Sequence, residues 1–246
     1  MGARPTAALL AIAAPGDTPV DFVRGIAQGI AERCAVYNAE LVGGDLTRSD
    51  SLVINVTAMG SLGGSGAPLT LDGARAGQKL VAHGKIGYSG AGLALLQRYG
   101  RALPPELDEL WPLIDAHCAP TLEPGRGVIA RATGSTAMTD NSDGLVRDVR
   151  HLAERSGVRI DFDRGAIAPD PLVAAAGAVL GIDPWEWVLA GGEDHTLLAT
   201  TFKAAPSGFR EIGRVMRGTG VTIDGEEPRY SCLLYTSPSP RDLSTS

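Results

Sequence analysis

Residues 138–158 read MTDNSDGLVRDVRHLAERSGV, and this stretch decides the fold class. It runs from a short strand-like segment through the acidic turn at 142–144 (SDG) into a helix. Leu145, Val149 and Leu152 recur at spacings of four and three, which places them on one face of that helix. A strand that leads directly into a helix with one apolar face is typical of α/β architecture.

The same alternation continues on both sides of this stretch. Residues 7–13 form an apolar run that predicts a buried strand, and a turn follows at residues 15–16. Thr18 and Pro19 are typical of a helix N-cap and first helical position, which predicts a helix to about residue 38. Further strands are expected over 51–60, 79–83, 158–162 and 195–200, and further helices from about residue 89 and over 171–180. The chain is therefore predicted to have a mixed α/β fold, with α+β mixed sheets.

Composition limits the classes of protein. The chain has 246 residues, of which 44% are hydrophobic and 20% charged, as in a soluble globular protein. The net charge of −6 argues against a nucleic-acid-binding surface, which requires an excess of Lys and Arg. No apolar run approaches the ~20 residues that span a bilayer. The three cysteines are scattered and form no C-x-x-C pair, which favours a reducing cytoplasm. A signal peptide over 6–14 and N-myristoylation at the N-terminus are the alternatives to the first strand.

Three acidic clusters carry the candidate chemistry: 43–45 (GGD), 140–144 (DNSDG) and 191–194 (GGED). In each, glycine allows the backbone to approach a ligand closely, and carboxylates supply the hard oxygens that Mg²⁺ prefers. Asp140 and Asp143 are three residues apart at a helix start, so they can face one ligand. Helix capping is the alternative role for residues 140–143, and turn formation is the alternative for the other two clusters.

Other common catalytic motifs are absent from the sequence. The glycine-rich run at 84–92 (GKIGYSGAG) lacks the Lys-Ser/Thr pair of a P-loop, and helix packing explains its glycines equally well. The four histidines show no metal-ligand spacing and are expected to be structural. No G-x-S-x-G motif supports covalent hydrolysis. Covalent hydrolysis and redox catalysis therefore have no support in the sequence.

Four segments of the chain, taken in order, resemble one family. They are LVGGDLTR at 41–48, GYSGAGLALL at 87–96, the stretch at 138–158 quoted above, and LAGGEDHTLLAT at 189–200. The set resembles the thiamine-monophosphate kinase family, of the aminoimidazole-ribonucleotide-synthetase-like superfamily. The resemblance covers about residues 1–228 and implies the two-domain fold of that superfamily.

The resemblance implies a reaction and a set of roles. ATP would phosphorylate thiamine monophosphate to thiamine diphosphate, with several Mg²⁺ ions holding the two polyanions together. By motif, the metal ligands would be Asp45, Asp140 and Asp143, the nucleotide contacts Gly44 and Ser142, and the thiamine contact Glu193. Positioning and charge neutralisation do most of the work in phosphoryl transfer, so a general base is dispensable. The resemblance also implies a cytoplasmic homodimer.

The domain organisation is expected to be incomplete. Residues 1–76 would form a partial N-terminal ATP/Mg-binding and dimerisation domain, and residues 77–231 a C-terminal α/β domain. The family places further aspartates before the position of Met1, so this chain is expected to be an inactive or nearly inactive fragment. Residues 232–246 (CLLYTSPSPRDLSTS) resemble a translated sequencing-library end and are expected to be a non-native or disordered tail, with an interaction tail as the alternative.

The chain also departs from the family pattern. Leu71 stands where the family has an Arg, Tyr88 where Asp is common, Asn141 where an apolar residue is usual, and His195 where Tyr is usual. Two alternatives stay open: another ATP-dependent enzyme of the superfamily, such as a selenophosphate synthetase, or a hydrogenase-maturation-type protein that works through a partner. The GGED cluster favours the kinase.

Overall fold

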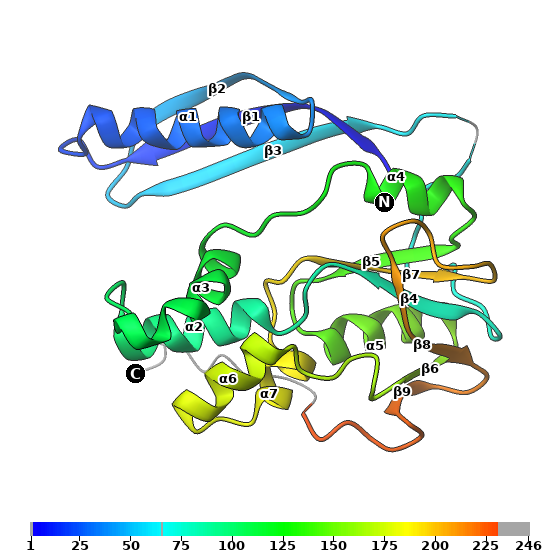
Figure 1. Cartoon of the computed structure of the whole chain (residues 1–246). Coiled ribbons are helices and arrows are strands. Elements are labelled where there is room, and N and C mark those ends of the chain that lie inside the picture. Colours follow the sequence, from blue (N-terminus) through cyan, green and yellow to red (C-terminus); the bar gives the residue numbers. More distant parts are fainter. Residues whose placement is uncertain (1, 65, 231–246) are drawn as a thin grey trace, which may run out of the picture. The chain divides into compact units, whose positions relative to one another are not determined.

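The computed structural model describes residues 2–64 and 66–230, and the chain divides into two compact units (Figure 1). The first contains the chain up to Leu69 together with Glu123–Thr133. The second contains Thr70–Leu122 and the chain from Gly134 onward. The change of unit at Leu69 precedes the boundary expected near residue 76, and the sequence pattern did not mark the return of residues 123–133 to the first unit. The functional roles of the two domains stay predictions, and the tail at 232–246 lies outside the described residues.

A three-stranded sheet with one helix against it forms the first unit. The strands β1 (Arg4–Ala14), β2 (Glu40–Arg48) and β3 (Val53–Ser61) lie in the order β2-β1-β3. Strand β1 pairs in parallel with β2 and antiparallel with β3. Helix α1 (Val20–Val36) makes the crossover that a parallel pair requires and lies along the sheet, and the short helix α4 (Arg126–Ala132) also belongs to this unit (Figure 1).

Alternation along β1 builds the small core of this unit. Ala8, Leu10, Ile12 and Ala14 are buried, whereas Leu9 is 39% exposed. Leu10, Ile12 and Ala14 pack against apolar side chains of α1 and against β2; these are Val23, Ile26, Ala27, Ile30 and Leu41. The strand predicted at 7–13 and the helix after it are confirmed, with β1 at the centre of its sheet and buried on one face.

The start of α1 differs from the prediction. The backbone N–H of Thr18 donates to the Pro15 carbonyl at 3.0 Å, which closes the predicted turn. Pro19, not Thr18, occupies the N-cap position, and no side chain caps the helix. The predicted Thr18 cap is therefore wrong, because the chain is still in its turn at that residue.

A six-stranded sheet organises the second unit. Its order is β5-β7-β4-β8-β6-β9. The strands are β4 (Lys79–His83), β5 (Ala137–Asn141), β6 (Arg159–Phe162), β7 (Thr196–Thr201), β8 (Arg210–Met216) and β9 (Gly220–Ile223). All neighbouring pairs are antiparallel except β6 with β9, which gives the mixed sheet that the sequence predicted.

Helix α5 (Leu145–Ser156) packs on this sheet through the face predicted for it. Leu145, Val149 and Leu152 are fully buried in one core cluster with Leu80 and Ile160 of the strands. Burying one apolar face of a helix on a sheet removes those side chains from water, which is the main driving force for the packing. The helix of the deciding stretch thus builds the core of the larger unit, while its strand β5 lies at the edge of the sheet.

A second core cluster is built from helices. It joins α2 (Tyr88–Tyr99), the 3₁₀ helix η1 (Pro105–Leu110), α3 (Trp111–Cys118), α6 (Pro171–Leu180) and α7 (Pro184–Ala190). The sequence predicted α2 and α6 but not the helices between 105 and 118. Within the part of the chain that the structure describes, no helix combines the length and apolar character that crossing a membrane requires.

Candidate functional site

Two of the three acidic clusters meet in the second unit. Strands β5 and β7 are paired with Asn141 opposite Thr196, so the motif at 140–144 and the motif at 191–194 leave the same end of the pair. Backbone hydrogen bonds extend this pairing beyond the strands. The N–H of Glu193 donates to the Ser142 carbonyl, and the N–H of His195 donates to the Asn141 carbonyl, both at 2.8 Å. The sequence identified both motifs, and the strand pairing brings them together.

Gly192 is required by this contact. A Cβ atom at Gly192 would lie 2.2 Å from the Ser142 carbonyl oxygen, closer than real Cβ contacts allow. Gly144 has a left-handed φ of 124° and faces the Ala190 carbonyl, where a Cβ atom would lie at 2.9 Å. The glycines of the two motifs therefore let their backbones touch, which accounts for them without a ligand.

The segment 193–195 alternates in backbone conformation. Glu193 and His195 adopt left-handed φ values of 63° and 51°, with Asp194 between them. Non-glycine residues in this region are strained and are held there by surrounding contacts, often at functional sites. The side chains of Glu193 and His195 contact each other, while that of Asp194 binds the start of α2. The glycine-rich motif thus presents one carboxylate outward and directs the next one inward.

Asp194 ties three segments together. Its carboxylate accepts hydrogen bonds from the backbone N–H groups of Gly87 at 2.6 Å and Ser89 at 2.8 Å, and from the Asn141 side-chain amide at 3.2 Å. Burial raises the pKa of Asp194 to about 7, against the lowering effect of the Ser89 and Gly87 hydrogen bonds. Sequence reasoning saw this residue in its cluster but assigned it no role, because its partners lie far away in the chain.

The glycine-rich run at 84–92 is explained by packing and by hydrogen bonds to Asp194, and it does not need to be a phosphate-binding loop. Gly87 is left-handed and precedes α2, whose first N–H groups bind Asp194. A Cβ atom at Gly92 would lie 2.0 Å from the Leu113 carbonyl oxygen, so α2 and α3 touch backbone to backbone there. The rejection of a P-loop agrees with this packing.

Asp148 holds the backbone of the 140–144 motif, as Asp194 holds the start of α2. It lies in the first turn of α5, and its Oδ2 accepts from the backbone N–H groups of Ser142 and Asp143, each at 2.9 Å. Burial raises the pKa of Asp148, although these two hydrogen bonds lower it. Sequence reasoning missed this residue. Its only signal was an acidic side chain early in an amphipathic helix, on a face that also carries buried apolar residues.

The capping alternative for residues 140–143 is wrong for α5. Gly144 is the N-cap of this helix, and no side chain caps it. Asp140 and Asp143 are instead turned outward, with side chains 31% and 59% exposed. Their carboxylates lie 3.4 Å from His195 Nδ1 and 3.9 Å from Arg147 Nη2, respectively. Both are therefore accessible for a ligand, while Asp148 binds the backbone of the same loop.

His195 lies between two predicted site residues. Its Nδ1 is 3.4 Å from Asp140 Oδ2, and its Nε2 is 3.5 Å from Glu193 Oε2. The side chain of Glu193 is 63% exposed and that of His195 is 33% exposed. The sequence placed His195 among the structural histidines, since no spacing connected it to a site; strand pairing supplies that connection.

The donor set fits Mg²⁺ bound together with phosphate. Among residues 2–64 and 66–230, no group of three or more His, Cys, Asp or Glu side chains is arranged to hold a metal ion. Mg²⁺ in nucleotide-dependent enzymes is commonly bound by one or two carboxylates plus the substrate phosphates, with water completing the shell. Asp140 and Asp143 supply two such carboxylates near the end of β5. They suit a metal shared with a polyanion, and they do not form an all-protein cage.

Gly44 and Asp45 lie in the first unit. Both are inside β2, where Leu10 of β1 pairs with Gly44 and Ala11 pairs with Asp45. The turn alternative is therefore wrong for this cluster, because Asp45 lies within a strand. A Cβ atom at Gly44 would overlap the Leu10 carbonyl oxygen, at 1.7 Å, so the strand pairing itself demands glycine there. The convergence of Asp45 with Asp140 and Asp143 remains a prediction.

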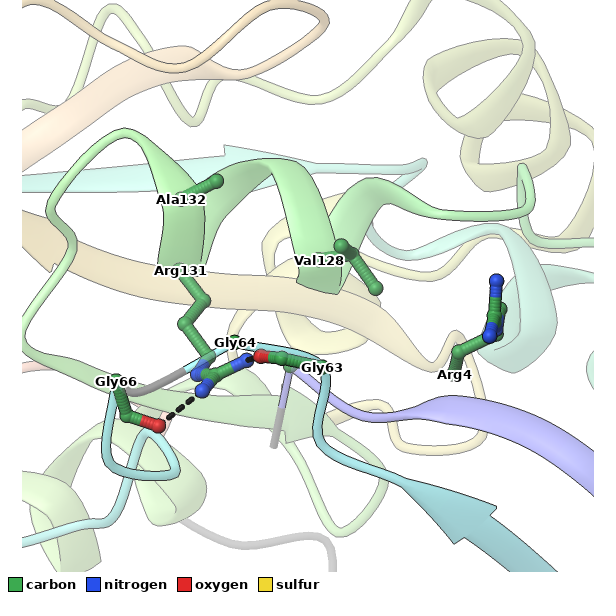
Figure 2. A pocket seen from close by; sticks show the side chains of 8 residues that line it. Arg4, Gly63, Gly64, Gly66, Val128, Arg131 and Ala132 are labelled. Atoms are coloured by element: carbon green, nitrogen blue, oxygen red, sulfur yellow. Dashed lines mark hydrogen bonds between the residues drawn. The ribbon is translucent and has the colours of Figure 1, made fainter.

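The first unit also contains a cavity of about 480 Å³ (Figure 2). Its lining includes Arg4, Val128 and Arg131 together with glycines of the segment after β3. The Arg131 guanidinium donates to the carbonyls of Gly63, Gly66 and Ala67, so this cation already holds the loop. None of the predicted site residues lines this cavity, and we assign it no role.

Three positions in the second unit that depart from the family pattern lie in or against its core. Leu71 packs partly buried against the sheet core, and its carbonyl accepts from Ser156 Oγ. Tyr88 is buried in the helical core cluster, with Lys85 Nζ 4.9 Å from its ring centroid. Asn141 is fully buried, and its amide donates to Asp194. The substitutions therefore keep the packing around the two motifs.

Comparison with known proteins identifies the family of this chain. A model of the AIR synthase related protein N-terminal domain matches residues 1–62. The chain is 62% identical, over 234 residues, to the thiamine-monophosphate kinase of Corynebacterium glutamicum, covering 94% of this chain and 70% of that protein. The chain belongs to the thiamine-monophosphate kinase family. The crystal structure of the family member from Aquifex aeolicus matches with a TM-score of 0.83 at 33% identity, covering 92% of this chain and 75% of the other.

Another thiamine-monophosphate kinase structure extends the match. It is described as AaThiL complexed with AMPPCP and TMP, and it covers 94% of this chain and 73% of its own, with a TM-score of 0.81 at 32% identity. AMPPCP is an analogue of ATP. The family resemblance identified from the ordered motifs is thus confirmed, as is the fold expected from it.

Proposed function

We propose that this chain serves the thiamine-monophosphate kinase reaction, in which ATP phosphorylates thiamine monophosphate to thiamine diphosphate. Its family membership and the meeting of the 140–144 and 191–195 loops support this proposal. The loop contact is the observation that carries it at the level of residues. It brings the loop of Asp140 and Asp143 against the loop of Glu193, whose side chain is 63% exposed and lies 3.5 Å from His195.

The proposed roles are those that the family motifs imply, and the exposed side chains of Asp143 and Glu193 support them. Asp140 and Asp143 would hold Mg²⁺ in the second unit, and Ser142 between them would contact the nucleotide. By the family motif, Asp45 would hold Mg²⁺ and Gly44 would contact the nucleotide. Glu193 would bind thiamine monophosphate. When bound, Mg²⁺ supplies positive charge that lets two phosphorylated ligands approach each other.

The chain's own residues position and orient rather than transfer protons. The acceptor is a phosphate oxygen that is already anionic, so no side chain has to remove a proton from it. Holding the acceptor and the γ-phosphoryl group in line supplies a large share of the rate enhancement in such reactions. Asp148 and Asp194 contribute by fixing the two loops against α5 and α2. A cytoplasmic location and a homodimeric assembly complete the proposal.

Ligand binding tests the proposal without requiring turnover. Isothermal titration calorimetry of residues 1–246 with AMPPCP, with and without Mg²⁺, should show binding that depends on the metal. Asp143→Asn should weaken that binding by about tenfold or more, since it removes one charged ligand oxygen. Asp115→Asn, on the exposed face of α3, is the matched control and should bind as the unmodified chain does. Metal-independent binding, or equal effects of the two variants, would refute the proposed site.

Turnover is a second measurement. Formation of thiamine diphosphate from ATP and thiamine monophosphate should require Mg²⁺. Robust Mg²⁺-dependent product formation would support the proposed function, and product formation without the metal would contradict the proposed role of Mg²⁺.

A further inference from the structure

We propose that His195 is a positioning residue that couples the metal-binding carboxylate of Asp140 to the substrate-binding carboxylate of Glu193. The proposal rests on the proposed function and deepens it, because it names what holds the two halves of the site in register. Its basis is one imidazole ring with a carboxylate at each nitrogen, at 3.4 Å and 3.5 Å.

Backbone and side-chain hydrogen bonds fix the main chain that carries the His195 ring. The N–H of His195 donates to the Asn141 carbonyl at 2.8 Å, next to Asp140 in the chain. The following residue, Thr196, is fully buried and donates through its hydroxyl to the Lys85 carbonyl. The left-handed φ of 51° at His195 is thus held between two anchored neighbours. The Cα atom of His195 is therefore held in place relative to Asn141 and Thr196.

The ring separates two carboxylates that carry like charges. Without an intervening donor, Asp140 and Glu193 would repel each other and turn outward, since both side chains are partly exposed. A carboxylate only accepts hydrogen bonds, so a ring N–H of His195 donates to Asp140 or to Glu193, and the ring itself occupies the space between the two side chains. His195 therefore sets the distance between the position expected for the metal and the position expected for thiamine monophosphate.

Coupling of this kind matters for phosphoryl transfer. The acceptor phosphate must lie in line with the γ-phosphoryl group, and small errors in that geometry lower the rate strongly. If one residue sets the spacing of Asp140 and Glu193, removing it weakens the binding of thiamine monophosphate mainly when the Mg²⁺–nucleotide complex is also present. A purely structural residue would weaken binding equally in both conditions.

The variant His195→Asn tests this coupling. Asparagine tolerates left-handed φ better than most residues, so the backbone can be kept, and its short amide cannot reach both carboxylates. Calorimetric affinity for thiamine monophosphate should fall about fivefold in the presence of Mg²⁺ and AMPPCP, and less than about twofold in their absence. His151→Asn, at an exposed position of α5, is the matched control and should leave both affinities unchanged.

A double-mutant cycle separates coupling from general damage. In a Glu193→Gln background, the further change His195→Asn should alter the affinity for thiamine monophosphate by less than about twofold, since the partner charge is already absent. Additive losses in the cycle, or unchanged affinity in His195→Asn, would overturn the role of His195 while leaving the proposed function intact.

Two further outcomes are informative. If the unmodified chain shows no Mg²⁺-dependent binding of either ligand, the proposed function fails and the inference fails with it. If His195→Asn does not fold, as judged by thermal unfolding, His195→Gln replaces it, because its longer amide can still donate to one carboxylate. That variant should show a smaller loss than fivefold and the same dependence on Mg²⁺–AMPPCP; an equal loss in both conditions would contradict coupling.

Discussion

The carboxylate of Asp148 accepts a hydrogen bond from the backbone N–H of Ser142 at 2.9 Å, and a second from Asp143 at the same distance. The first turn of α5 thus holds, from below, the loop that carries the two proposed metal ligands. A helix packed on the sheet core gives this loop a rigid support.

Asp148→Ala should lower stability and ligand binding together. The substitution leaves two backbone N–H groups without their acceptor, which costs about 1–3 kcal/mol for each group that stays buried. Urea denaturation should show a lower midpoint, and the metal-dependent affinity for AMPPCP should fall. Asp115→Ala, on exposed α3 surface, serves as the control. An unchanged denaturation midpoint in Asp148→Ala would show that the loop does not depend on this carboxylate.

The raised pKa of Asp194 makes the free energy of unfolding depend on pH. Its pKa of about 7 in the folded state exceeds the ordinary value of 3.8, so between these values the folded state holds a proton that the unfolded state has lost. Stability attributable to this group therefore falls as pH rises through that window, by about 1.4 kcal/mol per pH unit at most. Asp148, whose pKa burial also raises, contributes with the same sign.

Asp194→Asn should flatten that profile. The measurement is the free energy of unfolding from urea denaturation at intervals between pH 4 and 7.5, compared with the unmodified chain. The variant should also be less stable near neutral pH by about 1–3 kcal/mol, because an amide cannot accept from both Gly87 and Ser89 as a carboxylate does. A pH slope identical to that of the unmodified chain would contradict the assignment.

Gly192→Ala should separate the two loops. The added methyl group would lie 2.2 Å from the Ser142 carbonyl oxygen, so one of the backbones must move. The expected cost is about 1–3 kcal/mol of stability, with weaker binding of thiamine monophosphate. Gly25→Ala in α1 has nothing within 4 Å of the new Cβ atom and should instead stabilise the chain by about 0.5–1 kcal/mol. Equal effects of the two substitutions would contradict the close contact.

Metal removal should abolish nucleotide binding and spare the fold. The described residues form no closed protein cage for a metal, so EDTA should leave the thermal midpoint of the free chain nearly unchanged. In the presence of AMPPCP, added Mg²⁺ should raise that midpoint, because a ligand that binds only the folded state stabilises it. A large drop in the midpoint of the free chain with EDTA would indicate a structural metal instead.

Much of the fold was readable because its signals are local. Strand β4 and helix α6 have the bounds that periodicity predicted. The segment 105–118 was missed because prolines and acids break its apolar pattern, although Leu110, Leu113 and Ile114 are buried. The passage of residues 123–133 into the first unit had no sequence signal, since contacts made across the chain decide it.

Part of the candidate site could likewise be predicted from the sequence, and part of it could not. Glycines beside carboxylates in a fixed order identified the family and the candidate ligands, because these motifs are contiguous in the chain. The supporting residues were decided by tertiary structure alone: Gly87 and Asp194 are 107 residues apart, and His195 and Asp140 are 55 apart. The pairing of β5 with β7 makes those contacts possible. A linear sequence shows which groups are present, but hydrogen bonds over such separations exist only once the sheet has formed.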